Sequence, residues 1–534
     1  DERTAKYMPP HGYQGGFGSC GAFASTYYQM TYMNALVKGY DFTTETDVDS
    51  KILSPKFTYN IGKKADNKRQ GVWPSTAYAI VQKHGCPSNK DFKYVDFYTT
   101  HETNASDYRG WPTEAEIWTN ALKNKVQKSG WGNIGDLNEL TPVKNSQDPN
   151  LNLIKTLLAN GYILNVVTPI GWVTEDLPND GIICVEVTSG DNMQYHAMTV
   201  VGYDDDFSYT HEGVTGHGAF KLIDSKKEDY ECWFAYDALN AKSALFPDKE
   251  RLQGWVNNEF TWVTMYKNYR PKLLAEFKIT TNNRGAVDLS LGYGNALSSE
   301  PSEQWKPFIF NETKYIDDDG GNNSFNINGT KNEEENSATV ILDYTDLINE
   351  KEADRIDEEL EWYLSSNSDI SDFKIIEMRI DDAETDVTEI HKVEYPSVGT
   401  LPNDTGTISC TCQLPLKVDK DKIWNVFVNY PLDKNSVNPN TVQIKDSKEK
   451  NTIANVLLEN DTQIVVTPRE NTQGKYYSLM IDGIKTVAGN GLISPVNKYF
   501  FFAPDIEDEV DYSIESSFTD EKFLDIIRDL VNKP

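Results

Sequence analysis

A cysteine stands near the start of the chain, where a glycine-rich loop leads into a predicted helix. The loop runs from Gln14 to Cys20, and apolar residues then recur every three or four positions, at Phe23, Tyr27 and Met30. A thiol in the first turn of a helix lies at the positive end of the helix dipole, which favours the thiolate. Gln14 offers a side-chain amide donor of the kind that stabilises an oxyanion. The alternative interpretation is a buried structural cysteine.

A thiolate nucleophile needs a base, and one of the chain's seven histidines is suitably placed. His196 begins a short apolar run bounded by glycine and aspartates, which predicts a buried strand. A histidine at a strand end can act as a general base, although it can also be a core residue. A second strand-like run, residues 218–223, ends at Asp224, whose carboxylate can orient an imidazole. We therefore expect Cys20 and His196 to meet, with Asp224 beside them or merely at a strand end.

These motifs occur in an order that resembles the papain-like cysteine peptidases. The matching segments are Gly-Ser-Cys-x-Ala-Phe, His-Ala-Met-Thr-Val-Val-Gly-Tyr and Lys-Leu-Ile-Asp-Ser. The resemblance implies that Cys20 is the nucleophile, His196 the general base and acid, and Gln14 the oxyanion donor. It also implies that the backbone of Gly71 pairs with substrate. It covers roughly residues 1–268 and implies a two-lobed α+β domain, with the cysteine on a helical lobe and the histidine on a β lobe.

Two departures from the family pattern bear on the predicted site. Gly21 stands where the family has tryptophan, and Asp224 stands where it has asparagine. The tryptophan that follows this asparagine in the family is replaced by Lys226. An aspartate can still accept the imidazole N–H and hold its tautomer. Without the covering tryptophan, we expect the pair of His196 and Asp224 to be wetter and weaker.

Length, charge and cysteine content limit the class of protein. A chain of 534 residues is too long for one core and predicts three or four domains. A net charge of −31 excludes a general nucleic-acid binder, because a phosphate backbone would be repelled. No apolar run is long enough to predict a membrane span. The six cysteines form no dense disulfide framework, which favours a bacterial or archaeal enzyme in an extracellular or cell-surface location.

The sequence changes character after about residue 268. Short β-rich runs predict a β-sandwich accessory domain at 269–408, similar in position to the lectin-like domains of clostridial surface peptidases. Asp317 and Asp319 lie in an acidic segment with glycine and asparagine, so they are weak candidate calcium ligands. A solvated surface loop is the alternative, because the spacing matches no EF-hand. Catalysis itself is expected to require no cofactor.

The last part of the chain has the pattern of a second β-domain. At 409–505, short strands separated by regular turns predict an Ig-like sandwich, which resembles the bacterial Ig-like repeats of S-layer proteins. Residues 506–534 form an acidic tail in which Thr519 begins a predicted short helix. The predicted fold is therefore multidomain, with an α+β papain-like peptidase domain followed by two all-β sandwich domains.

The sequence predicts a secreted or cell-surface cysteine endopeptidase that hydrolyses peptide bonds through an acyl-enzyme. Its expected partners are protein or peptide substrates, with cell-wall or glycan contacts through the β-domains. One alternative is a catalytically impaired papain-like adhesion or scaffold protein, which the changes at Gly21 and Asp224 support. Retention of Gln14, Cys20 and His196 argues against it. The other alternative is a Cys-His transpeptidase or amidase that acts on cell wall.

Overall fold

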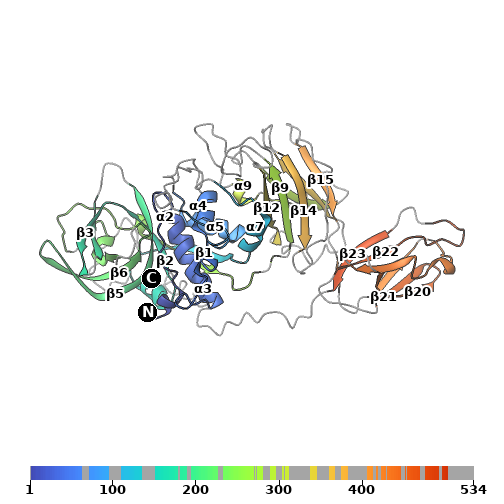
Figure 1. The fold of residues 1–534 in the computed structure, drawn as a ribbon, viewed down its shortest axis with the longest axis horizontal. Helices are drawn as coiled ribbons and strands as arrows, with labels where there is room; N and C mark the ends of the chain where they lie inside the picture. Colours follow the sequence, from blue (N-terminus) through green and yellow to red (C-terminus); the bar gives the residue numbers. More distant parts are fainter. Residues whose placement is uncertain are drawn as a thin grey trace, which may run out of the picture.

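The computed structural model defines the fold over most of the first half of the chain and over separate β-segments of the second half (Figure 1). The residues it describes are 2–62, 71–95, 110–134, 151–178, 181–188, 194–226, 232–243, 245–269, 271, 273–280, 289–295, 303–305, 307–311, 337–345, 360–366, 374–382, 406–412, 416–418, 423–428, 430–446, 451–452, 454–468, 476–491 and 496–502.

The helical lobe is built around one long buried helix that begins at the predicted cysteine. This central helix comprises α2 (Cys20–Ala22), the π-helix η1 (Phe23–Met30) and α3 (Thr31–Lys38), and Gly39 ends it with a left-handed φ of 75°. The helix predicted at this position is confirmed. Its neighbours are α1 (Glu2–Tyr7), η2 (Val48–Ser50), α4 (Pro55–Gly62), α5 (Pro74–His84) and α7 (Ala115–Ala121).

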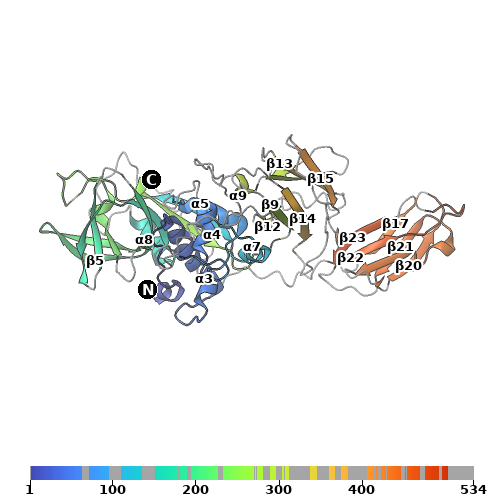
Figure 2. The ribbon, with the colours of Figure 1, turned by 45° about the horizontal axis from the view of Figure 1, so that its top comes forward.

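The β lobe is an eight-stranded sheet with the order β1-β8-β2-β5-β6-β7-β4-β3. Figure 2 shows its long strand β5 on the opposite side of the central helices from α7. Helix α8 precedes β2, and Gly161 lies two residues after it with a φ of 88°. The bounds are β1 (Val126–Asn133), α8 (Asn152–Ala159), β2 (Leu164–Pro169), β3 (Trp172–Asp176), β4 (Ile182–Val187), β5 (Tyr195–His211), β6 (Val214–Ile223), β7 (Cys232–Ala235), η5 (Tyr236–Leu239), η6 (Val256–Asn258) and β8 (Glu259–Met265).

Two further sheets follow, with the orders β12-β9-β14 and β11-β10-β13-β15. The first packs on the helical lobe, because one hydrophobic core includes Trp118 of α7 together with Phe277 of β9 and Val340 of β12. At this junction, Lys125 Nζ lies 2.7 Å from Asp343 Oδ2, with both side chains buried. The bounds are β9 (Leu273–Thr280), β10 (Leu289–Asn295), β11 (Glu303–Trp305), α9 (Phe308–Asn311), β12 (Ser337–Asp343), β13 (Leu360–Ser366), β14 (Lys374–Asp382) and β15 (Gly406–Cys412).

The last described segments form two sheets, β16-β23-β22-β18-β19 and β17-β21-β20, around a separate core that includes Trp424 and Ile464. Their bounds are β16 (Leu416–Val418), β17 (Trp424–Phe427), η8 (Lys434–Ser436), β18 (Val442–Asp446), β19 (Asn451–Thr452), β20 (Ala454–Asn460), β21 (Gln463–Pro468), β22 (Tyr476–Ile481) and β23 (Val496–Phe502).

The large sheet with its helices and the additional β-sheets fit a multidomain α+β fold. Asp317, Asp319 and the tail 506–534, in which a short helix was predicted, lie outside the described residues. No helix within the described ranges has the length and apolar character needed to cross a lipid bilayer.

Candidate active site

The structure brings His196 and Asp224 together at one end of two neighbouring strands. His196 is the second residue of β5, and Asp224 directly follows β6. Because the strands are antiparallel and Thr199 pairs with Ile223, the chain that continues past Ile223 runs alongside β5 toward His196. The imidazole Nε2 lies 2.7 Å from Asp224 Oδ1. This carboxylate is therefore placed to hold the ring orientation.

Cys20 meets the same imidazole from the helical lobe, where α2 contacts β5. Burial alone would raise the pKa of the Cys20 thiol, but a side-chain interaction with His196 and its positive charge outweigh burial, so that pKa is lowered. Nε2 is engaged with Asp224, which leaves Nδ1 for the thiol. Nδ1 is buried and makes no hydrogen bond of ordinary geometry to the described residues, so it is not occupied by another partner.

The imidazole of His196 shows the complementary shift. Burial by itself lowers the pKa of His196, but Asp224 and Cys20 raise this pKa by more than burial lowers it, so that it is about 9. The lowered thiol pKa and the raised imidazole pKa both favour the form in which the proton is on nitrogen rather than on sulfur. The pair is therefore set up as a thiolate beside an imidazolium, which is the reactive form of a cysteine nucleophile.

The expectation that the pair of His196 and Asp224 would be wet is wrong. Their side chains are only 8% and 12% exposed. The N-terminal segment lies against the pair, and His11 Nε2 donates to the Asp224 carbonyl oxygen over 2.9 Å. The backbone N–H of Lys226 also donates to Asp224 Oδ1 over 2.9 Å. Both of these hydrogen bonds lie at exposed positions, and they hold Asp224 in place.

Gln14 is fully buried and links the cysteine loop to the segment after Asp224. Its side-chain N–H donates to the Phe17 carbonyl over 2.9 Å, and its Oε1 accepts from the Ser225 hydroxyl over 2.7 Å. Its backbone N–H donates to the Ser225 carbonyl over 2.8 Å. One of the two amide hydrogens is used by Phe17, and the oxyanion role predicted for Gln14 depends on the other and stays a prediction.

Tyr94 supports the same loop and was not found by sequence reasoning. Its hydroxyl donates to the Gln14 carbonyl over 2.7 Å and lies 2.7 Å from the Ser19 hydroxyl. Its ring meets Phe23 edge to face, with 4.8 Å between the ring centroids. No motif surrounds Tyr94, and Ser225 stood out in the sequence only as the last residue of the segment Lys-Leu-Ile-Asp-Ser. Only the fold shows that they hold the loop that carries Cys20.

Gly71 lies beside this loop and is exposed, and a Cβ atom there would lie 3.5 Å from the Gly18 carbonyl oxygen.

The next residue, Val72, explains why position 21 holds glycine instead of the family's tryptophan. A Cβ atom at Gly21 would lie 1.8 Å from the Val72 carbonyl oxygen, so no side chain fits without moving the backbone. The departure is thus accompanied by a close approach of this segment to α2.

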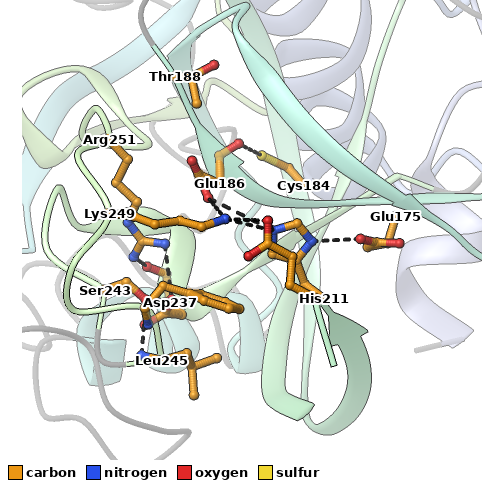
Figure 3. A network of polar contacts seen from close by, with 12 residues as sticks. Glu175, Cys184, Glu186, Thr188, His211, Asp237, Ser243, Leu245, Lys249 and Arg251 are labelled. Carbon is orange, nitrogen blue, oxygen red and sulfur yellow. Dashed lines mark hydrogen bonds and ion pairs between the residues drawn. The ribbon is translucent and has the colours of Figure 1, made fainter. Parts of the chain in front are cut away.

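A second buried histidine lies in the β lobe, within the polar network of Figure 3. His211 Nδ1 lies 2.7 Å from Glu175 Oε1, and His211 Nε2 lies 3.5 Å from Lys249 Nζ. The thiol of Cys184 is also present, but it donates to the Glu186 carbonyl over 3.5 Å. Burial raises the pKa of the Cys184 thiol, so this cysteine is held as a neutral thiol.

Among the described residues, no group of three or more His, Cys, Asp or Glu side chains is arranged to hold a metal ion. The weak calcium candidates Asp317 and Asp319 are outside these residues and stay a prediction.

No protein-family model and no curated protein matches the sequence. Several solved structures are similar in fold. Xylellain, a cysteine protease from Xylella fastidiosa, has 17% identity and a TM-score of 0.31, over 49% of this chain and 85% of that chain. Procathepsin B S9 from Trypanosoma congolense has 13% identity and a TM-score of 0.31, over 49% of this chain and 73% of that chain.

The cysteine protease and lectin-like domains of Cwp84, a surface layer associated protein of Clostridium difficile, are also similar. They share 12% identity and a TM-score of 0.30, over 69% of this chain and 82% of that chain. At such TM-scores, the interpretation of the candidate site depends on its own geometry.

Proposed function

We propose that this protein is a papain-like cysteine endopeptidase, secreted or held at the cell surface. The observation that carries the proposal is a thiol with a lowered pKa beside an imidazole with a raised pKa, with a carboxylate 2.7 Å from that imidazole. Cys20, His196 and Asp224 supply these groups from separate parts of the chain. In a cysteine peptidase each of them has a defined role.

In the proposed reaction, the Cys20 thiolate attacks the carbonyl carbon of a peptide bond. The second amide hydrogen of Gln14 and the backbone N–H of Cys20 stabilise the negative oxygen that forms. His196 then gives its proton to the departing amine, which leaves a thioester on Cys20. Water, deprotonated by His196, hydrolyses the thioester and restores the thiol proton to the pair. The exposed backbone of Gly71 is available to pair with an extended peptide.

The contact between Asp224 and His196 favours an enzyme over a catalytically impaired scaffold. A decayed site would have no need to keep the imidazole oriented, nearly buried and beside a thiol of lowered pKa.

The experiment is a thiol titration with an epoxide inhibitor, followed by mass-spectrometric mapping and a fluorogenic peptide assay. We expect one equivalent of label on Cys20 near neutral pH, with loss of peptide hydrolysis in proportion. Cys86 is the internal control, because burial raises the pKa of its thiol. Labelling that spares Cys20, or full labelling of Cys20 with unchanged hydrolysis, would refute the proposal.

A further inference from the structure

A buried polar network lies between the helical lobe and the eight-stranded sheet, directly behind the candidate site. We call it the interlobe network. Its members are Gln29 of η1, Tyr78 of α5, Asn165 of β2, Thr199 of β5 and Thr261 of β8. None of these residues belongs to the predicted site.

Gln29 is the centre of the network, and its side-chain amide is fully hydrogen-bonded. Its Nε2 donates to the Ile163 carbonyl over 2.7 Å and to the Thr261 carbonyl over 3.1 Å. Its Oε1 accepts from Asn165 Nδ2 over 2.7 Å and from the Tyr78 hydroxyl. All four hydrogen-bonding positions of this amide are therefore used; two of the partners, Asn165 and Thr261, lie on strands of the sheet, and Ile163 directly precedes β2.

Asn165 and Thr199 extend the network toward the reacting groups. They face each other on neighbouring strands, and the Thr199 hydroxyl lies 3.0 Å from Asn165 Oδ1. The same hydroxyl lies 3.1 Å from the carbonyl oxygen of Ala24, so its single proton is shared between two acceptors. Asn165 Nδ2 also donates to the Tyr78 hydroxyl over 2.9 Å, and Tyr78 in turn contacts the Thr261 hydroxyl over 2.9 Å.

The contact between Thr199 and Ala24 links the two elements that carry the reacting side chains. Ala24 is four residues after Cys20 on the central helix, and Thr199 is three residues after His196 on β5. Apolar packing tolerates small sliding movements because it is non-directional, whereas hydrogen bonds depend steeply on distance and angle. Each member apart from Thr261 is buried, so a shift of the helix along the sheet would leave polar groups unpaired at high cost.

We infer that the interlobe network fixes the position of Cys20 relative to His196, with Thr199 and Asn165 as positioning residues for the pair. The inference rests on the proposed function for its effect on turnover. Its effect on the thiolate can be measured without any peptide substrate.

The test compares Thr199→Val, which removes the hydroxyl, with Thr199→Ser, which keeps it, and with the matched control Thr58→Val. Thr58 is equally buried, and its hydroxyl lies 2.7 Å from that of Thr26, but both residues belong to the helical lobe. Losing the Thr58 hydroxyl therefore removes a buried hydrogen bond without touching the link between helix and sheet.

We expect Thr199→Val to lower kcat about tenfold or more with KM changed by less than about twofold, because a displacement near 1 Å is enough for such losses. The pH midpoint for alkylation of Cys20 by iodoacetamide, followed on the Cys20 peptide by mass spectrometry, should move up toward that of a free thiol. Thr199→Ser and Thr58→Val should keep the wild-type midpoint. A wild-type midpoint in Thr199→Val, or an equal shift in Thr58→Val, overturns the inference.

If Thr199→Val does not fold, Tyr78→Phe applies the same criterion at another member of the network, and an unchanged midpoint there overturns the inference. The alkylation profile separates this inference from the proposed function. A wild-type protein that cleaves no peptide but has a low midpoint dependent on Thr199 refutes only the function. Active enzyme with a midpoint indifferent to Thr199 refutes only the network.

Discussion

Two buried histidines in the β lobe lie at the same distance from a carboxylate oxygen, 2.7 Å, yet their surroundings differ. His196 pairs with Asp224, and its remaining nitrogen is left for the Cys20 thiol. His211 pairs with Glu175, and its remaining nitrogen lies 3.5 Å from the Lys249 ammonium group. A buried histidine with a carboxylate is thus no sign of catalysis by itself. The group on the other ring nitrogen decides what the pair can do.

The electrostatics of Lys249 fit a structural role for the His211 cluster. The nitrogen of His211 that faces Lys249 also lies 3.9 Å from Glu212 Oε1 and 4.0 Å from Glu186 Oε2. Lys249 also lies 3.3 Å from Glu186 Oε2 and 2.8 Å from Glu212 Oε1. Lys249 is thus held in fixed ion pairs with two carboxylates, whereas the thiolate at Cys20 lies beside a proton on His196 that can leave with a product.

The largest expected effect separates the two cysteines of these regions. Cys20→Ala should reduce peptide hydrolysis by at least about 10³-fold, because the covalent path is lost. Cys184→Ala should keep the activity and lower the free energy of unfolding by about 1 kcal/mol, because it only leaves a small cavity. Steady-state kinetics and thermal unfolding of both variants test the contrast. Turnover in Cys20→Ala equal to wild type would end the peptidase interpretation.

The histidines themselves provide the next contrast. His196→Gln should lower kcat by about 10³-fold, since neither the thiolate nor the leaving amine would have a proton partner. His211→Gln should retain kcat while lowering the melting temperature, because it disturbs the polar contacts of a buried side chain. If His211→Gln is inactive although circular dichroism shows that it is folded, the contrast between a catalytic His196 and a structural His211 is wrong.

Asp224 should have a smaller effect than either member of the reacting pair. Asp224→Ala should lower kcat about tenfold to a hundredfold, whereas Asp224→Asn should retain much of it because the amide oxygen still accepts the imidazole N–H. Unchanged kinetics in Asp224→Ala would make the site a dyad of Cys20 and His196.

The pH profile gives a more modest effect and a defined sign. His196 has its pKa raised to about 9, so the imidazolium is present below that value and is lost as pH rises through it. The kcat/KM of the wild type should therefore fall on the alkaline side near pH 9. In Asp224→Ala this alkaline limb should move to lower pH, because the largest stabilising partner of the imidazolium is gone. An unmoved limb would mean that Asp224 does not hold the proton on His196.

The sequence was sufficient to predict the elements that carry the reacting residues, because the signals are local. A glycine loop before an apolar helix, and a short apolar strand after His196, depend on neighbours within a few positions. The positions of Tyr94, Gln29 and Asn165 had no such signal, since their partners are far away in the chain. Sequence pattern does not reveal which distant backbone a buried polar group will meet.

The expectation of a wet site was wrong for the same reason. It considered only the residue that replaces the family's tryptophan, whereas Asp224 is also contacted by His11, more than two hundred positions away in the chain. The glycine at position 21 likewise had no local explanation. Its cause is the backbone of Val72, which approaches too closely for any side chain.

The shared core between the helical lobe and β12 has a consequence for how such a chain can be rearranged by recombination. A crossover just after Tyr269 would part Lys125 from Asp343 and divide one set of buried side chains between two parents. A crossover between β15 and β16 would leave the described members of these two cores on separate sides. The segment that carries the candidate active site and has to be exchanged as one piece therefore includes the sheet β12-β9-β14. Only the module formed by β16 to β23 is expected to be exchanged freely among unrelated proteins.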